Sequence, residues 1–326
     1  GCLQKRAIPQ SVCFGICQRI GDMQSGEIVV SISCITYNHA PYIRQCLDGF
    51  MMQQTNFAFE VLIHDDASTD GTTEIIKEYE REYPDIIKPI YEEENQWIKG
   101  RRGSAVFNFP RAKGKYIAMC EGDDYWMDPL KLQKQVDFLE KNVNVALCSH
   151  LFGEKKGDTL GDIVNRGWAG KTFGISDLIR GEWPLQTATI LFRRDYIAQD
   201  ILCNFRVFTE TTLVYLLLKK GKGIVLPDVM SVYRVTSQGL WSGKDDSDQW
   251  AMVADVRLAI YEVEKSHEAI ELVLNSTKAT IGRMTYLKHY RITMTIIVLM
   301  ISHSGLIHTL KWLLNKFFLG RGCLNN

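Results

Sequence analysis

Residues 118–126 read Ala-Met-Cys-Glu-Gly-Asp-Asp-Tyr-Trp, and this stretch decides how the rest of the chain is interpreted. The apolar run that begins at residue 116 is short and has no helical periodicity, which predicts a buried strand. It ends in three carboxylates: Glu121, Asp123 and Asp124. Unpaired charges in a protein core are costly, so we expect this cluster to face a cleft, a cation or water. Ligands of open α/β sheets bind at that edge, and we hypothesise a divalent metal ion that holds a phosphorylated substrate.

The overall composition limits the classes of function. The chain has 326 residues, with 38 Lys and Arg against 38 Asp and Glu, and this balance argues against nucleic acid as the main partner. The hydrophobic fraction of 46% is ordinary for a globular protein. The nine cysteines form no Cys-x-x-Cys pair, so we expect neither a zinc site nor a disulfide framework. A reducing compartment, hence a cytoplasmic location, follows from the same observation.

Strand and helix signals alternate along the first half of the chain. Apolar, β-branched runs predict strands at residues 28–35, 59–63, 86–91, 116–120 and 145–152. Apolar residues at helical spacing lie between several of these runs, and this alternation is typical of an α/β fold with a mostly parallel sheet flanked by helices. Residues 1–26 show no clear period and are expected to form an N-terminal tail.

Two other predicted strands also end in polar side chains. The first leads into Thr36, Tyr37 and Asn38, and the second into Asp65 and Asp66. The carboxyl ends of parallel strands lie at one edge of a sheet, so the three polar clusters can meet in one crevice.

These motifs resemble the three signatures of family 2 glycosyltransferases. The matching stretches are residues 30–38, 65–72 and 121–124, in the same order and with similar spacing. The resemblance covers residues 28–150 and, more loosely, 151–242. It is closest to bacterial enzymes that build capsule, lipopolysaccharide or other surface glycans. It implies the GT-A (Rossmann-like) fold, a nucleotide-diphosphate sugar as donor, with a UDP-sugar the first choice, and inversion at the anomeric carbon.

The same resemblance implies a division of the chain. A GT-A catalytic domain would span residues 27–245, with a nucleotide-sugar half at 27–150 and an acceptor half at 151–245. Residues 246–326 would form a C-terminal helical extension.

Donor binding would fall to the first two motifs. The resemblance implies that Tyr37, flanked by Thr36 and Asn38, stacks on the base of the nucleotide. Asp66, or Asp65 beside it, would accept a hydrogen bond from a base N–H. The alternative for the two aspartates is turn and helix-cap chemistry, which Asp side chains also favour.

Metal binding would fall to residues 121–124, which we call the acidic turn. The family's Asp-x-Asp pattern corresponds to Glu121-Gly122-Asp123 here, so Asp123 is the expected ligand for Mg²⁺ or Mn²⁺, which prefer oxygen ligands. Asp124 would either bind the ion or orient a neighbour, and Glu121 would contact the ribose or a metal-bound water. The alternative is an acidic turn that only caps a helix.

The chemistry also needs a base that takes the proton of the acceptor hydroxyl. The family places it near the start of a helix in the second half of the domain, where Glu210 precedes an apolar helix at residues 213–218. The alternative is an acid favoured by the helix dipole. Arg234 would contact the diphosphate and Trp241 would cover the sugar. The alternatives are a surface salt bridge for Arg234 and a packing role for the aromatic ring of Trp241.

The C-terminal part departs from the α/β pattern and predicts helices. The apolar run at residues 292–301 is shorter than the ~20 residues that a membrane span needs. Residues 306–319 have the pattern of an interfacial amphipathic helix. Such a helix would give peripheral contact with the inner face of the cell membrane and would suit a lipid-linked acceptor as well as a glycan. Packing on the catalytic domain or on a second subunit is the alternative.

Two other functions fit parts of the pattern. A sugar nucleotidyltransferase shares the parallel sheet and acidic site, but would need a Gly-rich, basic loop after the first strand, which residues 36–41 lack. A non-catalytic nucleotide-sugar binder is the second alternative, against which the acidic residues at positions 66, 123 and 210 argue.

Overall fold

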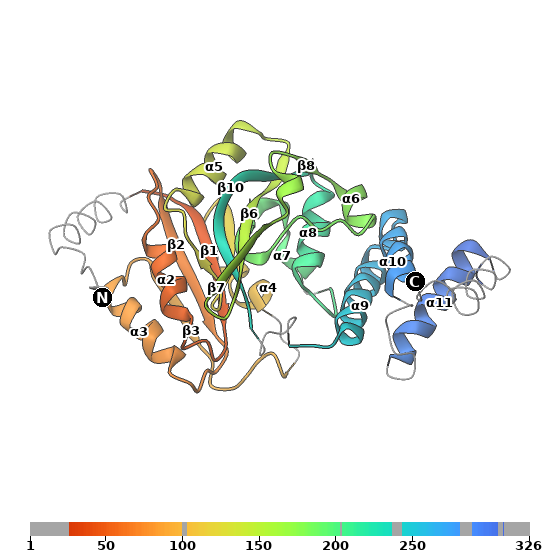
Figure 1. Ribbon diagram of the computed structural model, residues 1–326, viewed down its shortest axis with the longest axis horizontal. Coiled ribbons are helices and arrows are strands. Elements are labelled where there is room, and N and C mark those ends of the chain that lie inside the picture. The colour runs from red at the N-terminus through yellow and green to blue at the C-terminus, as the bar shows by residue number, and fades with distance from the viewer. Residues whose placement is uncertain are drawn as a thin grey trace.

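The computed structural model describes residues 26–99, 103–202, 204–236, 243–280, 289–305 and 309. A curled sheet of ten strands lies at the centre, and helices pack around it (Figure 1). The order of the strands across the sheet is β3-β2-β1-β4-β9-β6-β10-β5, while β7 pairs with β6 and β8 with β10. This is the α/β architecture that the sequence predicts.

The strands, in chain order, are β1 (Ile28–Thr36), β2 (Ala58–Asp65), β3 (Ile87–Tyr91), β4 (Tyr116–Glu121), β5 (Tyr125–Trp126), β6 (Val145–Lys156), β7 (Thr159–Val164), β8 (Thr172–Phe173), β9 (Leu191–Arg193) and β10 (Lys222–Val235). The α-helices are α2 (Ile43–Met51), α3 (Thr72–Glu82), α4 (Gly103–Phe107), α5 (Lys131–Lys141), α6 (Ile175–Ile179), α7 (Gln199–Leu202), α8 (Glu210–Leu218), α9 (Asp246–Glu264), α10 (His267–Thr280) and α11 (Tyr290–Ser304). Short 3₁₀ turns are η1 (Phe109–Arg111), η2 (Arg166–Trp168), η3 (Thr187–Thr189) and η4 (Arg194–Tyr196).

The long ladders of the sheet are parallel. Strands β3, β2, β1 and β4 pair in parallel, as do β6 and β10. The antiparallel ladders are short, and two of them place β9 between β4 and β6. All five strands expected from apolar runs are present, and sequence reasoning missed the short β5, β7 and β8 because two to six residues carry little pattern.

The register of β1 brings the polar strand ends together. Thr36 pairs with Asp65 of β2, and Ile35 pairs with Glu121 of β4. All eight residues of β2 are buried, as expected for a parallel strand covered on both faces. The three turns that follow these strands therefore start from the same level of the sheet.

Thiols fill part of the core beneath this edge. Cys34 and Cys120 pair across β1 and β4, and the Sγ atom of Cys46 lies 3.5 Å from the carbonyl oxygen of Glu121. All three thiols are buried and free. Burial raises the pKa of Cys120 to about 11 and that of Cys148 to about 12, so these thiols pack as small apolar groups.

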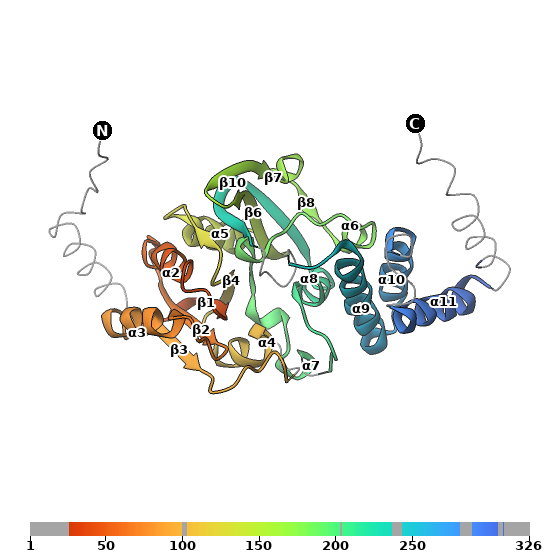
Figure 2. The same ribbon diagram turned by 60° about the horizontal axis from the view of Figure 1, so that its bottom comes forward.

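The three C-terminal helices lie at one end of the molecule, beyond α8 and opposite β3 (Figures 1 and 2). α9 packs on α8 and α10, and Ala254 and Leu258 of α9 share an apolar cluster with Ile296 and Met300 of α11. The expected apolar run lies within α11, which is 15 residues long. No helix among the described residues is long and apolar enough to cross a membrane. The tail at residues 1–25 and, apart from residue 309, the predicted amphipathic segment at 306–319 lie outside the described residues.

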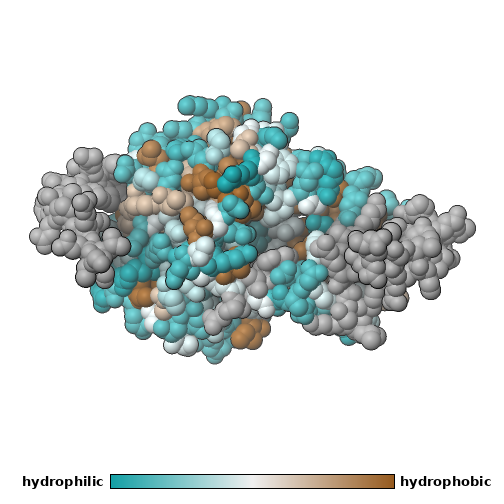
Figure 3. Space-filling view, viewed as in Figure 1, coloured by the Kyte–Doolittle hydropathy of each residue, from teal (hydrophilic) through white to brown (hydrophobic). Residues whose placement is uncertain are grey.

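The surface shows apolar side chains mainly in small groups. The face in Figure 3 is largely hydrophilic, with brown residues in separate clusters. On α11, Tyr290, Met294 and Val298 are exposed at a spacing of four residues, so they lie on one side of that helix.

A fully buried lysine joins α5 to the core. Lys131 donates a hydrogen bond to Oε1 of Gln135 at 2.7 Å, and its Nζ atom lies 4.0 Å from the ring centroid of Trp126. Burial disfavours the charged ammonium and lowers the pKa of Lys131 to about 7.

This pKa predicts a pH-dependent contribution to stability. The unfolded chain keeps its proton up to about pH 10.4, whereas folded Lys131 releases it near pH 7. Between these values the unfolded state binds more protons, so rising pH favours the folded state. The variant Lys131→Met has no amine at this position and lacks this pH-dependent stabilisation. The free energy of unfolding of the variant, relative to the parent, should therefore fall between pH 6.5 and pH 9.5 in urea titrations.

Lys141→Met, at the exposed end of the same helix, serves as the control. It should show no such change with pH, and an equal response of the two variants would contradict the assignment.

Candidate active site

The turns after β1 and β2 are joined by hydrogen bonds. The backbone N–H of Asn38 donates to Oγ of Ser68 at 2.9 Å, and Oδ1 of Asn38 accepts from the backbone N–H of Thr69 at 2.8 Å. Asn38 has a φ of 54°, a left-handed conformation that Asn tolerates better than most residues. The two predicted donor-binding motifs are thus joined to each other, and Tyr37 of the first is 44% exposed.

Both aspartates of the second motif are buried and hold backbone in place. Asp65 accepts from the N–H of Ser68 at 3.1 Å and from the hydroxyl of Thr73. Asp66 accepts from the N–H groups of Gln96 and Trp97 at 2.6 and 3.1 Å. Turn chemistry therefore accounts for Asp65, and Asp66 fixes the loop after β3 through the backbone of residues 96–97.

The acidic turn gathers three carboxylates. One oxygen from each of Glu121, Asp123 and Asp124 lies within 4.8 Å of the others. Burial and then the neighbouring carboxylates, Glu210 first among them, raise the pKa of Glu121 well above its usual value. Burial and the charge of Asp123 raise the pKa of Asp124. A cation among these oxygens would relieve that repulsion, so the donor set fits a hard divalent ion.

Gly122 allows this turn to pack against the first motif. A Cβ atom at Gly122 would lie 2.5 Å from Oγ1 of Thr36 and 2.9 Å from Nδ1 of His39. These distances are too short for non-bonded atoms, so the residue between Glu121 and Asp123 has to be glycine for the turn to sit here.

Asp124 is fully buried and both its oxygens are paired. Oδ2 accepts from Nε2 of Gln186 at 2.6 Å, and Oδ1 accepts from the backbone N–H of Arg234 at 2.8 Å. Asp123 is partly exposed, with 14% of its side chain accessible. Of the two roles predicted for Asp124, orienting the acidic turn agrees better with this environment than direct metal binding.

Arg234 of β10 holds the acidic turn through hydrogen bonds. Its guanidinium donates to the carbonyl oxygen of Asp123 and to Oε1 of Gln45. It also lies 4.5 Å from the ring centroid of Tyr125 and 5.1 Å from that of Tyr42. Arg234 is thus buried within the site, and its predicted contact with a diphosphate would add to these bonds.

Glu210 is the first residue of α8, as the sequence predicts. Its Oε1 atom accepts a hydrogen bond from the hydroxyl of Thr187 at 2.9 Å. The neighbouring Gln186 donates to Asp124, so the predicted base lies close to the acidic turn, in agreement with the effect of its charge on the pKa of Glu121. The structure therefore brings together a carboxylate from residues 27–150 and one from residues 151–245.

Sequence reasoning assigned no role to three side chains that the structure places here. Nε2 of His39 lies 4.0 Å from Oδ2 of Asp123, and Gln186 and Thr187 contact Asp124 and Glu210. His39 follows the first motif directly, which was a usable signal. Gln186 and Thr187 lie in the stretch at residues 183–189, which the sequence indicates as part of the acceptor side. Their individual contacts could not be predicted, because their partners are distant in the sequence. Trp241, predicted to cover the sugar, lies outside the described residues.

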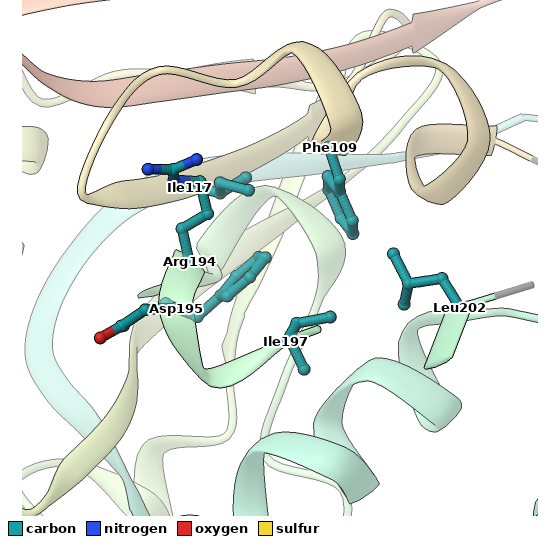
Figure 4. A pocket seen from close by; sticks show the side chains of 7 residues that line it. Phe109, Ile117, Arg194, Asp195, Ile197 and Leu202 are labelled. Atoms are coloured by element: carbon teal, nitrogen blue, oxygen red, sulfur yellow. The ribbon is translucent and has the colours of Figure 1, made fainter. Parts of the chain in front are cut away.

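A separate apolar cavity of about 310 Å³ contains none of the predicted site residues. Phe109, Ile197 and Leu202 point into it, whereas the charged ends of Arg194 and Asp195 point away (Figure 4). The acidic turn does not line this cavity, so the carboxylate site lies elsewhere in the fold.

Comparison with known families agrees with the motifs and their geometry. A family model described as glycosyl transferase family 2 matches residues 31–202, more than half of the chain. The chain belongs to this family. The match contains the acidic turn and both donor motifs, and it ends before Glu210.

Curated relatives include proteins of bacterial surface-glycan synthesis. The uncharacterized protein Mb1547 of Mycobacterium bovis is 35% identical over 219 residues, which are 65% of this chain and 60% of the relative. The chain thus spans about 60% of the length of that relative. TuaG of Bacillus subtilis, named a putative teichuronic acid biosynthesis glycosyltransferase, is 26% identical over 75% of this chain and 92% of its own.

Solved structures share the fold at low identity. TarS of S. aureus, in complex with UDP-GlcNAc, has a TM-score of 0.59 and 17% identity over 83% of this chain and 80% of its own. The mannosyltransferase PcManGT of Pyrobaculum calidifontis, in complex with GDP-Man and Mn²⁺, has a TM-score of 0.53 and 18% identity over 96% of this chain and 91% of its own.

Gly122 provides a test of the acidic turn. Gly122→Ala should destabilise the fold by about 1–3 kcal/mol, a usual cost of overpacking, and should weaken Mn²⁺ binding because the turn must move away from Thr36. Thermal unfolding and calorimetric titration with Mn²⁺ measure the two effects.

Gly167→Ala is the matched control, since a Cβ atom at that position would meet no atom within 4 Å. Parent-like Mn²⁺ binding by Gly122→Ala would show that the close packing of this turn is not needed for the ion.

Proposed function

We propose that this chain is an inverting glycosyltransferase of surface polysaccharide biosynthesis. It would move a sugar from a nucleotide-diphosphate sugar to a hydroxyl of a glycan or lipid-linked acceptor. A UDP-sugar is the first choice of donor. The observation that carries the proposal is that the adjacent residues Gln186 and Thr187 contact Asp124 of the acidic turn and Glu210, so the two carboxylates lie near each other at the carboxyl edge of β1 and β4. A single displacement needs a base for the attacking hydroxyl on one side of the anomeric carbon and a group that stabilises the leaving diphosphate on the other side.

The donor side would use the two joined turns. The exposed ring of Tyr37 is available for stacking on a base. Asp66 holds the backbone at residues 96–97, which would form a wall of the base site, and its oxygens keep further acceptor capacity. The names of the relatives, and the UDP-GlcNAc and GDP-Man in the related structures, support a nucleotide sugar as ligand.

The acidic turn would hold a divalent ion, Mg²⁺ or Mn²⁺. Asp123 is the partly exposed carboxylate and would bind the ion, while Asp124 keeps the turn in position. Glu121 would contact the ribose or a metal-bound water. When bound, such an ion neutralises charge on the leaving diphosphate.

Glu210 would take the proton from the acceptor hydroxyl as that oxygen attacks the sugar. Thr187 occupies only one of its carboxylate oxygens with a hydrogen bond, which leaves the other for the acceptor. The name of the relative TuaG, a putative teichuronic acid biosynthesis glycosyltransferase, supports a glycan or lipid-linked acceptor. Cytoplasmic location with peripheral membrane contact through the C-terminal segment belongs to the same proposal.

A panel of UDP-, GDP- and dTDP-sugars, with and without Mn²⁺, tests the function. We expect metal-dependent release of the nucleoside diphosphate from at least one donor, measured by a coupled assay, and a rise in melting temperature with that donor. No metal-dependent turnover and no binding of any donor would refute the enzyme proposal.

Two substitutions separate binding from chemistry. Asp123→Asn should abolish the Mn²⁺-dependent rise in melting temperature, because it removes the exposed carboxylate. Glu210→Gln should keep donor binding and lower kcat by about 10²–10⁴-fold, the usual contribution of a general base.

Asp158→Asn in the exposed turn before β7 and Glu268→Gln at the start of α10 are matched controls that should behave as the parent. Full transfer by Glu210→Gln would place the base elsewhere.

A further inference from the structure

One short turn contacts both halves of the proposed catalytic site. Gln186 precedes η3 and donates from Nε2 to Oδ2 of Asp124 at 2.6 Å. Thr187, the next residue, donates from its hydroxyl to Oε1 of Glu210 at 2.9 Å. The two side chains therefore leave adjacent backbone positions and reach the acidic turn on one side and the predicted base on the other.

The turn is fixed to the core at several points. The indole N–H of Trp126 donates to the carbonyl oxygen of Ala188 at 2.9 Å, and Nε2 of Gln135 donates to that of Thr189 at 2.9 Å. The hydroxyl groups of Thr189 and Ser149 lie 2.7 Å apart. All these partners are fully buried or nearly so. Any displacement of η3 would break buried hydrogen bonds, which are costly to leave unmade.

The backbone of the turn also sets the orientation of the Gln186 amide. Its Oε1 atom accepts from the backbone N–H of Ala188 at 2.7 Å. The NH₂ group must then face the other way, toward Asp124. A carboxylate in this place could accept from Ala188 but would present a second negative oxygen to Asp124, so the amide suits both neighbours.

Thr187 restricts Glu210 in a similar way. A single hydroxyl donor bound to Oε1 limits rotation of the carboxylate at the start of α8. Within the described part of the chain the second oxygen accepts no hydrogen bond, so it is available to another partner. One rigid turn thus holds the carboxylates of Asp124 and Glu210 at a fixed distance from each other.

We propose that Gln186 and Thr187 are positioning residues of the transfer reaction. Gln186 orients Asp124, and through it the acidic turn that would receive the metal and diphosphate. Thr187 orients Glu210 toward the acceptor hydroxyl. The inference rests on the proposed function. In this reaction, η3 would set the distance between the leaving diphosphate and the attacking oxygen.

The two residues should fail in different ways when substituted. Gln186→Leu should weaken binding of UDP with Mn²⁺ by about 10–100-fold, the usual effect of removing a partner of a metal-site carboxylate. Thr187→Val should leave this affinity and the KM for donor unchanged and lower kcat by about tenfold, which corresponds to the loss of about 1.4 kcal/mol in the transition state. Thr187→Ser should restore kcat, because it restores the hydroxyl.

The measurements are calorimetric titration of Mn²⁺ and UDP, steady-state turnover of the donor that the parent hydrolyses, and thermal unfolding. Thr211→Val, in the same helical turn as Glu210, is the control for Thr187→Val and should leave kcat unchanged. Gln186→Glu serves as a second variant with similar shape. It should also weaken Mn²⁺–UDP binding, even where Gln186→Leu lowers the melting temperature.

The outcomes separate the two proposals. If the parent binds Mn²⁺–UDP and turns over a donor but the variants match it, the positioning roles are wrong and the proposed function stands. If both substitutions change binding and kcat to the same degree, or if Thr187→Ser resembles Thr187→Val, η3 has only a structural role. If the parent itself shows neither binding nor turnover with any donor, the proposed function fails, and the inference fails with it.

Discussion

The buried carboxylate of Asp124 is the constraint on which the arrangement of the site depends. An ionised group with no exposed surface needs partners for both oxygens, and here they come from distant parts of the chain: Gln186 before η3 and the backbone of Arg234 in β10. Satisfying Asp124 therefore requires that both halves of the α/β fold be assembled. It also fixes the adjacent Asp123, whose carbonyl oxygen Arg234 binds from the other side.

This arrangement gathers like charges at the expense of stability. Burial and the charges of neighbouring carboxylates raise the pKa of Glu121 and Asp124. Their ionised forms are therefore unfavourable here unless a cation lies nearby. Lys131 shows a similar conflict within the core, because burial lowers its pKa to about 7. Its hydrogen bond orients the amide of Gln135, which in turn donates to the carbonyl oxygen of Thr189. The buried ammonium thus contributes to holding η3, and such local conflicts are common at functional sites.

The sequence predicted those features that local pattern determines. Strands β1, β2 and β4 are mostly apolar runs, and the polar residues at the end of each run are visible directly, so the meeting of three turns could be deduced. The place of Glu210 at the start of α8 came from the family resemblance and agrees with the helix boundary. The environment of Asp66 and Arg234 could not be predicted, because their partners at residues 96–97 and at Gln45 are set by tertiary packing. The apolar run at residues 190–192 indicates the short β9, but its antiparallel place between β4 and β6 is set by tertiary packing and could not be predicted.

That short reversed strand explains how a site of two halves can be rigid. β9 pairs with β4 on one side and with β6 on the other, so it joins the strand that ends in the acidic turn to the later part of the sheet. The residues just before it form η3, and the carbonyl oxygen of Ile190 accepts from the backbone N–H of Met119 in β4 at 3.0 Å. Because η3 and the acidic turn are both fixed to β4, their separation does not depend on a flexible connection. A reaction in which the attacking oxygen and the leaving group lie on opposite sides of one carbon benefits from such a fixed spacing.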